Sequence, residues 1–333
     1  MTTDRNLNLL VTVLAGFVAL GCDDDAKSTP KRATFDPVPD VAKGPAVPAA
    51  GYLVQEVKDK LYWLSDGIYS SMFLSTGVGV IVVDAPQTIA PNLLAAIASV
   101  TSEPITHVIY SHHHADHIGG AGVLPKEAVY IAQSSTAALL RREADPNRPV
   151  PTVTFDDTYT LSVGTQTLIL DYKGPNHDVG NVFIYAPSQK VLMLVDVVWP
   201  GWAPFAELGS PVDIKGYLDA HGQALAYDFQ TLIAGHVNRL GTRDDVTMDT
   251  AYLADLEANA AAALQKFDPT TVVGELSDPT NAWAYASLLL AGWPKNCETD
   301  TLSKWRGKLG GLDVFVGANC TGMQNGLRGG DLP

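Results

Sequence analysis

The run His112-x-His114-x-Asp116-His117 constrains this chain more than any other feature, because it packs three imidazoles and a carboxylate into six residues. Side chains alternate along an extended segment, so His112 and His114 would point to the same side. A turn after Ala115 would bring Asp116 and His117 to an adjacent position. Imidazole and carboxylate groups bind transition metals, and a catalytic zinc site takes three protein ligands plus a water. The run therefore predicts a metal centre, but it lacks the ligands for two complete sites.

Three further candidate ligands each follow an apolar segment that has the pattern of a buried strand. They are His177, Asp196 and His236, which follow predicted strands at 166–172, 191–195 and 231–234. Polar groups at the ends of several buried strands converge at one edge of a sheet, where functional loops gather. We therefore expect these three residues to complete the site. The other histidines, His107, His113 and His221, are expected to bind no metal.

Residues 51–241 resemble the metallo-β-lactamase superfamily. Its His-x-His-x-Asp-His motif is present in full, and its later His, Asp and His occur here in the same order. The resemblance implies an α/β fold, the four-layer αββα sandwich. It also implies the metal ligands: His112, His114 and His177 on one metal, Asp116, His117 and His236 on a second, and Asp196 bridging both. Two Zn²⁺ ions are the expected cofactors, with Fe or Mn as alternatives.

Three positions refine the resemblance. A bridging Asp196 is the pattern of the glyoxalase II-like and lactonase-like branches, whereas the true β-lactamase branches have Cys or Ser thereabouts. Asp84 matches the strand-end Asp of the superfamily and would support the ligand loop. Asp178 departs from the pattern, because many relatives have Thr after the preceding His; this affects substrate contacts rather than metal binding.

These residues predict a dinuclear zinc hydrolase that cleaves an ester, lactone or related acyl bond with a metal-bound hydroxide. Two metals sharing a water would lower its pKa toward neutrality, and Asp116 would orient the nucleophile and pass its proton on. The alternatives are a β-lactamase, a glyoxalase II-like thioesterase, an iron-dependent persulfide dioxygenase, and a metal-binding lipoprotein without catalysis. No cluster of Lys and Arg marks a glutathione site, which weakens the glyoxalase II alternative.

The loop after Asp196 contains three large aromatic residues, Trp199, Trp202 and Phe205. In this superfamily that loop lies near the metals, so these side chains would form an apolar wall for an acyl chain or ring. Packing against C-terminal helices is the equally weighted alternative.

The N-terminus has the pattern of an export signal. The apolar run from Leu9 to Leu20 is too short to span a bilayer, and it ends at Cys22 in a sequence that resembles a bacterial lipobox. We therefore expect an exported protein of the bacterial cell envelope, periplasmic or anchored to the membrane by a lipid on Cys22. The expected organisation is a signal segment over 1–22, a flexible linker over 23–50, a catalytic domain over 51–241 and a mostly helical extension over 242–333.

Composition bears on the partners. The formal net charge of −14 over 333 residues disfavours nucleic acid and leaves a small-molecule substrate as the expected partner.

The C-terminal segment contains two cysteines, Cys297 and Cys320. In an oxidising compartment they would pair, which would stabilise the fold by ~3 kcal/mol, and the alternative is two buried free thiols.

Overall fold

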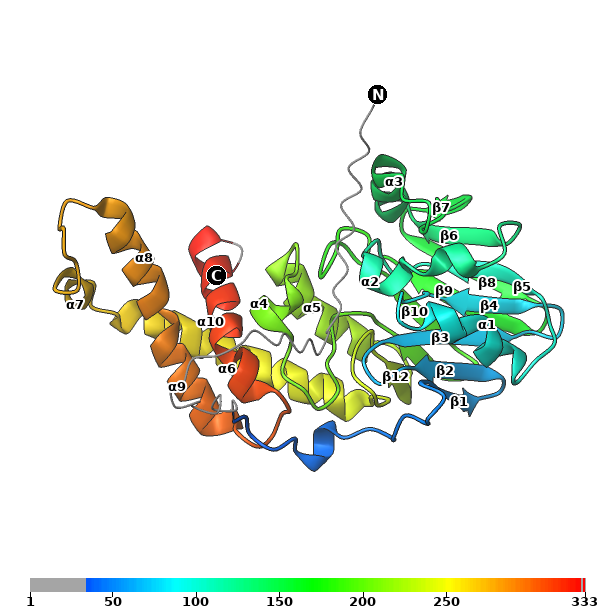
Figure 1. Cartoon of the computed structure of the whole chain (residues 1–333), viewed down its shortest axis with the longest axis horizontal. Helices are drawn as coiled ribbons and strands as arrows, with labels where there is room; N and C mark the ends of the chain where they lie inside the picture. Colours follow the sequence, from blue (N-terminus) through cyan, green and yellow to red (C-terminus); the bar gives the residue numbers. More distant parts are fainter. Residues whose placement is uncertain (1–33, 331, 333) are drawn as a thin grey trace, which may run out of the picture. The chain divides into compact units, whose positions relative to one another are not determined.

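The computed structural model describes residues 34–330 and 332. The predicted signal segment over 1–22, with Cys22, and the first part of the predicted linker lie outside the described residues. The described residues from Phe35 onward form one compact unit (Figure 1). Within the described residues, no helix combines the length and the apolar character that crossing a membrane requires.

The first of two β-sheets has seven strands in the order of the sequence. Strands β1 to β4 pair antiparallel, and β4 to β7 pair parallel. The central strand β4 is a run of β-branched residues with both faces buried, as parallel strands require. The strands are β1 (Leu53–Lys58), β2 (Leu61–Ser65), β3 (Ser70–Ser75), β4 (Val80–Val83), β5 (Ile105–Ile109), β6 (Val129–Gln133) and β7 (Val153–Phe155).

The second sheet has five strands in the order β12-β11-β10-β9-β8. Its strands pair antiparallel except for β11 and β12, which run parallel. The strands are β8 (Thr158–Val163), β9 (Gln166–Asp171), β10 (Phe183–Ala186), β11 (Val191–Met193) and β12 (Thr231–Ile233).

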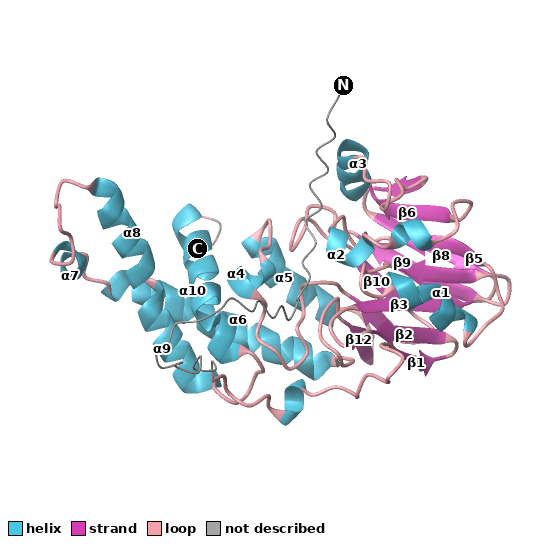
Figure 2. Cartoon of the chain, viewed as in Figure 1, coloured by secondary structure: helices cyan, strands magenta, loops and turns pink. Residues whose placement is uncertain are grey.

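The two sheets pack face to face, and helices cover both outer faces (Figure 2). Side chains such as Trp63 and Leu170 fill the space between the sheets. Helices α1 (Ala90–Ala98), α2 (Ala115–Ile118) and α3 (Ser134–Glu143) pack on the first sheet, and α5 (Ile214–Leu225) and α6 (Arg243–Lys266) pack on the second. The predicted αββα sandwich is confirmed.

The three short strands over 152–172 do not form one continuous meander. β7 pairs parallel with β6 at the end of the first sheet, whereas β8 and β9 form a hairpin in the second sheet. The two-residue connection between β7 and β8 is therefore where the chain passes from one sheet to the other. The sequence pattern shows three short strands but not which sheet each one joins.

The C-terminal extension is helical, as predicted. It contains α6, α7 (Thr270–Val273), α8 (Ala282–Gly292), α9 (Pro294–Trp305) and α10 (Leu312–Gly329). A capping box between Thr242 and Asp245 begins α6, and its buried face packs with α9 and α10 in the core beside the second sheet. Cys297 of α9 and Cys320 of α10 form a disulfide bond.

The second half of the predicted linker packs against the folded domain. Ala42, in the short 3-10 helix η1 (Asp40–Ala42), is fully buried, and its carbonyl accepts a hydrogen bond from Nε1 of Trp202 at 2.8 Å. Asp36 forms an ion pair with Arg306 at 2.7 Å. The composition of residues 35–50 does not predict these contacts. Because of them, any flexible tether is limited to the residues before this segment.

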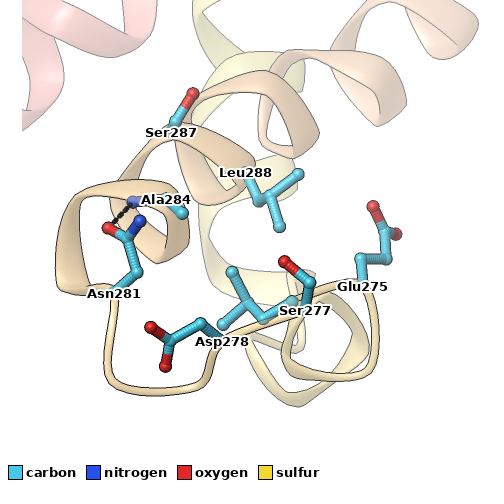
Figure 3. A pocket seen from close by; sticks show the side chains of 8 residues that line it. Glu275, Ser277, Asp278, Asn281, Ala284, Ser287 and Leu288 are labelled. Carbon is cyan, nitrogen blue, oxygen red and sulfur yellow. Dashed lines mark hydrogen bonds between the residues drawn. The ribbon is translucent and has the colours of Figure 1, made fainter.

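One cavity of about 300 Å³ lies in the extension, between α8 and the loop that precedes it (Figure 3). Glu275 and Asp278 are its only charged lining residues, and it contains no His or Cys. Its composition gives no reason to place chemistry there.

Acid sensitivity is expected from His221, a fully buried residue of α5 outside the predicted site. Its Nδ1 donates to the carbonyl of Tyr217 at 3.0 Å. Burial lowers its pKa from 6.5 to about 4, although hydrogen bonds to the backbone oppose the shift. The folded state therefore binds this proton less readily than the unfolded state, so stability is full above about pH 6.5 and falls as the pH approaches 4.

The shift corresponds to a loss of about 3 kcal/mol at 1.36 kcal/mol per pKa unit. We expect His221→Leu to show a smaller fall in Tm than the wild type between pH 7 and pH 4.5, measured by thermal denaturation. Parallel curves for the two proteins would contradict this account of His221.

Candidate metal centre

The candidate ligands lie in the segments that follow four strands, at one edge of the sandwich. The run from His112 follows β5, and its last two ligands, Asp116 and His117, lie in the short helix α2. His177 lies between β9 and β10, Asp196 follows β11, and His236 follows β12. The structure brings all seven residues together, as the sequence pattern predicts.

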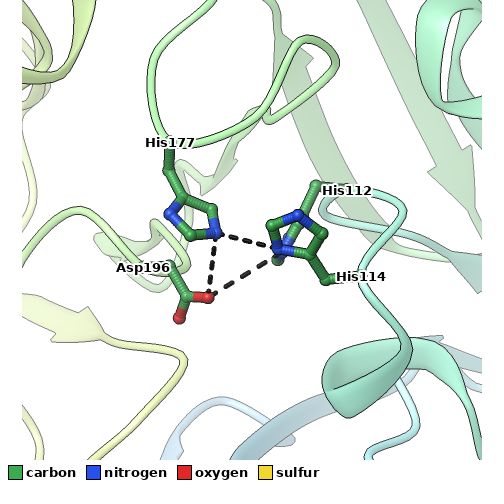
Figure 4. A group of neighbouring side chains, drawn as sticks. All are labelled: His112, His114, His177 and Asp196. Carbon is green, nitrogen blue, oxygen red and sulfur yellow. Dashed lines mark hydrogen bonds and ion pairs between the residues drawn. The ribbon is translucent and has the colours of Figure 1, made fainter. Parts of the chain in front are cut away.

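The first group of side chains is His112, His114, His177 and Asp196, whose ligand atoms lie within 4.8 Å of one another (Figure 4). Nε2 of His177 is 3.0 Å from Nδ1 of His114 and 3.2 Å from Oδ2 of Asp196. Nε2 of His112 is 3.8 Å from the same carboxylate oxygen. Three imidazoles and one carboxylate thus face a common point.

The second group is Asp116, His117, Asp196 and His236. Nε2 of His117 is 2.9 Å from Oδ2 of Asp196 and 3.4 Å from Oδ2 of Asp116. Nε2 of His236 is 3.4 Å from Oδ1 of Asp196 and 3.7 Å from Oδ2 of Asp116. Asp196 therefore belongs to both groups, and its carboxylate lies between them.

These separations fit metal ions. Ligand atoms about 2.0–2.1 Å from a tetrahedral zinc lie about 3.3–3.4 Å apart, and the nitrogen–oxygen distances of 2.9 to 3.8 Å here fall around that value. Nε2 of the fully buried His112 has no hydrogen-bond partner among the described residues, although buried polar atoms normally have one. A cation would satisfy this nitrogen.

The charges of the cluster also favour a cation. Burial and neighbouring histidines hold the pKa of His112 well below its usual range, and burial lowers the pKa of His177 to about 4, so both are neutral and have a free lone pair. Burial opposes charge on Asp196, but His117 and His177 outweigh it and hold its pKa well below its usual range.

His117 differs from the other imidazoles. Burial opposes its charge, but Asp196 and Asp116 outweigh burial and raise its pKa to about 9. When no metal is bound, a proton on His117 therefore offsets the negative charge of the neighbouring carboxylates. Metal binding at this group would release that proton, since a ligating histidine must be neutral.

Hydrogen bonds hold the ligand loops in place. Oδ1 of the buried Asp84 accepts the backbone N–H of Ser111 at 2.8 Å, and Oγ of Ser111 lies 2.9 Å from Nδ1 of His112. Asp84 thus supports the ligand loop. Nδ2 of Asn181 donates to Oδ1 of Asn176 and to the carbonyl of Val195, which ties the loop before His177 to the loop before Asp196.

Gly235 is required by the crowding at the centre. A Cβ at this position would lie 2.5 Å from Oδ1 of Asp196 and 2.8 Å from Cε1 of His117. Gly120, after the ligand run, is similarly close-packed, because its Cβ would lie 2.4 Å from Cβ of Ala90. These glycines let the backbone approach the side chains that they position.

His113 lies outside the two groups. Its Nδ1 is 2.6 Å from Oδ2 of Asp178, and its carbonyl accepts a hydrogen bond from Arg148 at 2.9 Å. Asp178 also lies 3.7 Å from Nε2 of His114, on the side of that ring away from His177. The residue that departs from the superfamily pattern therefore contacts a candidate ligand, and it would help to orient that ring.

Two aromatic rings pack against His236. Trp199 stacks on it with a centroid distance of 5.3 Å, and the ring of Tyr69 lies 4.7 Å from it. The predicted aromatic wall named Trp199, Trp202 and Phe205. Trp199 and Phe205 line the cavity over the metal centre, and Trp202 does not. The prediction missed Tyr69 and Ile68, which also line this cavity. Both precede β3, and nothing in the sequence pattern connects that loop to the ligands.

Comparisons with known proteins agree with this architecture. The family model of the metallo-beta-lactamase superfamily matches residues 64–236, just over half of the chain. The 2,4-dinitroanisole O-demethylase subunit alpha of Nocardioides sp. (strain JS1661) is 27% identical over 218 residues, which are 63% of this chain and 64% of that protein. A metallo-beta-lactamase type 2 of Bacteroides fragilis is 31% identical over 88 residues, or 26% of this chain and 34% of that protein. The chain thus spans less than two thirds of the curated relatives it matches.

A solved structure, the metallo-beta-lactamase from Pontibacter korlensis, has the same fold. It matches with a TM-score of 0.53 and 21% identity over 60% of this chain and 97% of its own. The two groups of His and Asp side chains in this fold support a metal cofactor. On the family match and the shared fold, the chain belongs to the metallo-beta-lactamase superfamily.

Proposed function

We propose that this chain is a dinuclear zinc hydrolase that cleaves an ester, lactone or related acyl bond. The observation that carries the proposal is the carboxylate of Asp196, which lies between two groups that each offer three further ligands. A shared carboxylate is the pattern of the glyoxalase II-like and lactonase-like branches. Membership of the superfamily supports the prediction that the chain is a metal-dependent enzyme.

The chain's own residues have distinct roles in this proposal. Metal ions held here would supply an activated water and polarise the carbonyl oxygen of the substrate. Asp116 is the ligand residue most open to the cavity, with its side chain 44% exposed, and its Oδ2 lies 3.4 Å from His117. It is placed to accept a proton from the attacking water and pass it to the leaving group. Trp199 and Phe205 line the cavity beside it.

Other activities of the superfamily fit less well. The cavity over the centre is about 350 Å³, and no Lys or Arg lines it. A β-lactam carries one carboxylate and the glutathione of a glyoxalase II substrate carries two, and neither substrate would find a Lys or Arg partner in this lining. A persulfide dioxygenase would use one iron and leave the second group without a metal. A metal-binding lipoprotein would need no open carboxylate such as Asp116.

A second candidate is removal of a methyl group from an activated aryl ether. It is favoured by the 27% identity to the 2,4-dinitroanisole O-demethylase subunit alpha and by the aromatic residues beside the centre. In such a reaction the water oxygen bonds to the ring carbon that bears the methoxy group. The bond from that carbon to the methoxy oxygen breaks, and methanol leaves with the proton.

The test is a substrate panel for the zinc-loaded full chain. The panel contains lactones, carboxylic esters, thioesters, β-lactams and 2,4-dinitroanisole. The proposal predicts the highest kcat/KM for an ester or lactone, and release of 2,4-dinitrophenol would instead favour the second candidate. Zinc binding without turnover of any member would overturn the enzymatic proposal and favour a binding protein.

Asp116→Asn tests the role of the open carboxylate. The amide keeps the shape of the side chain but cannot accept the proton, so we expect kcat to fall about 10²- to 10⁴-fold, as for loss of a general base. Zinc content would be measured in parallel, because Asp116 also belongs to the second group. Asp157→Asn, at an exposed carboxylate outside both groups, is the control. Full turnover by Asp116→Asn would remove the proposed role.

We also propose export and lipid anchoring through Cys22. The disulfide between Cys297 and Cys320 supports an oxidising compartment. In a bacterial host, the wild type is expected in the membrane fraction and Cys22→Ser outside it, as measured by immunoblotting of cell fractions. Equal membrane association of both proteins would contradict the anchor.

A further inference from the structure

A second cavity of about 230 Å³ opens beside the metal centre. Four residues line both this cavity and the cavity over the metal centre, so the two adjoin: Ile68, Trp199, Phe205 and His236. The remaining lining residues are Gly67, Trp202, Ala203, Val237, Asn238 and Phe315. Most of this surface is aromatic or aliphatic, and it begins at the face of a candidate metal ligand.

The tryptophans are held so that their polar atoms bond elsewhere. Nε1 of Trp199 donates to the hydroxyl of Tyr217 at 3.2 Å, and its backbone N–H donates to Asp249 at 2.7 Å. Nε1 of Trp202 donates to the carbonyl of Ala42. What remains for the cavity is the carbon surface of Trp202 and the part of Trp199 that His236 does not cover. Such surface binds another aromatic ring through stacked or edge contacts.

Phe315 brings the C-terminal extension into this cavity. It lies on α10, and its ring is 4.7 Å from that of Phe205, which is 56% exposed. The two rings form one wall of the cavity, and Trp199 and Trp202 line it as well. A residue far beyond the catalytic domain in sequence thus shapes the surface beside the metal centre.

The charge of the cavity selects a neutral ligand. No Lys, Arg, Asp or Glu lines it, and His236 is its only ionisable residue. Arg239 lies nearby in sequence, but its guanidinium is paired with Asp245 and with the carbonyl of Leu240. An anionic substituent would lose its hydration here without gaining a partner, which is unfavourable.

We propose that this cavity binds a neutral aryl group of the substrate and that Phe315 is a specificity-determining residue. The inference rests on the proposed function, because it places the aryl group beside the bond that the metal centre cleaves. It goes beyond that function by naming the substrate class and by giving the extension a role in recognition.

The test is binding of nitrobenzene to the zinc-loaded full chain. Binding is measured as saturable quenching of tryptophan fluorescence. Phe315→Ala is expected to weaken binding about tenfold, because it removes one aromatic wall. Val314→Ala, at the exposed neighbouring position of α10 that does not line the cavity, is the matched control and should bind as the wild type does. Phe315→Leu, with an expected loss of about threefold, replaces the alanine variant if that variant does not fold.

The charge selection is tested with 4-nitrobenzoate on the wild type stripped of metal, so that its carboxylate has no metal to bind. It should bind at least about tenfold more weakly than nitrobenzene, as expected for a charge desolvated without a partner. Phe315→Lys should reduce the difference in affinity between nitrobenzene and 4-nitrobenzoate, because the lysine gives the carboxylate a cationic partner. Equal binding of nitrobenzene by wild type and Phe315→Ala, or equal binding of the two ligands, would overturn the inference.

These outcomes are separable from the proposed function. Aryl binding that depends on Phe315, without turnover of any ester or ether, would refute the hydrolase and leave the cavity assignment standing. Turnover of an ester or ether without an effect of Phe315 on aryl binding would support the hydrolase and refute the cavity assignment.

Discussion

Asp196→Asn is expected to lose at least one metal ion per chain and to lower kcat/KM by on the order of 10³-fold. Changing residues that only support a ligand costs 10- to 100-fold, and Asp196 contacts four candidate ligands directly, so its loss should cost more. The amide is neutral and cannot serve both groups as the carboxylate does. Zinc content by elemental analysis and steady-state kinetics on the best substrate of the panel would measure both effects.

Asp249→Asn provides a matched control. Asp249 is also a fully buried carboxyl, and burial raises its pKa well above the usual range. It accepts a hydrogen bond from the backbone of Trp199, a bond that an asparagine oxygen can also accept. This variant should keep its full metal content. If both variants kept two metals, Asp196 would not be the bridge.

Removing the disulfide is expected to lower the free energy of unfolding by about 3 kcal/mol. The bond between Cys297 and Cys320 closes a loop with a sequence separation of 23, and the loss of loop entropy in the unfolded chain sets this magnitude. Both cysteines are fully buried in the core that α6, α9 and α10 share with the second sheet. The double variant Cys297→Ala/Cys320→Ala would be compared with the wild type by urea denaturation.

The metal centre gives this experiment an internal reference. None of the candidate ligands lies in α9 or α10, so zinc content should be unchanged in the double variant under native conditions. Adding a reductant to the wild type in urea should reproduce the lower midpoint, and the double variant should not respond to the reductant. Identical midpoints for the oxidised wild type and the double variant would show that the bond contributes no stability.

The sequence predicted the fold where strong local patterns agree with the tertiary structure. The strands predicted at 166–172, 191–195 and 231–234 are examples, and the superfamily resemblance is confirmed. The site was predictable for a related reason. His177, Asp196 and His236 each follow a strand, and strands of one sheet bring their ends to a common edge, so positions distant in sequence meet there.

The remaining features depend on contacts that leave no local pattern. β7 is a short strand whose sheet is decided by pairing with β6 rather than by its own residues. Residues 35–50 have the composition of a tether, yet Ala42 is buried against Trp202. Phe315 reaches the cavity only because α10 packs beside the loop after Asp196, and no periodicity within α10 reveals that neighbour.

The central claim is that two metal ions share Asp196, and anomalous scattering from crystals of the zinc-loaded protein at the zinc edge tests it most directly. The account predicts two peaks, one among His112, His114 and His177 and the other among Asp116, His117 and His236, with the carboxylate of Asp196 in contact with both. A single peak, or a second peak that Asp196 does not contact, would contradict it.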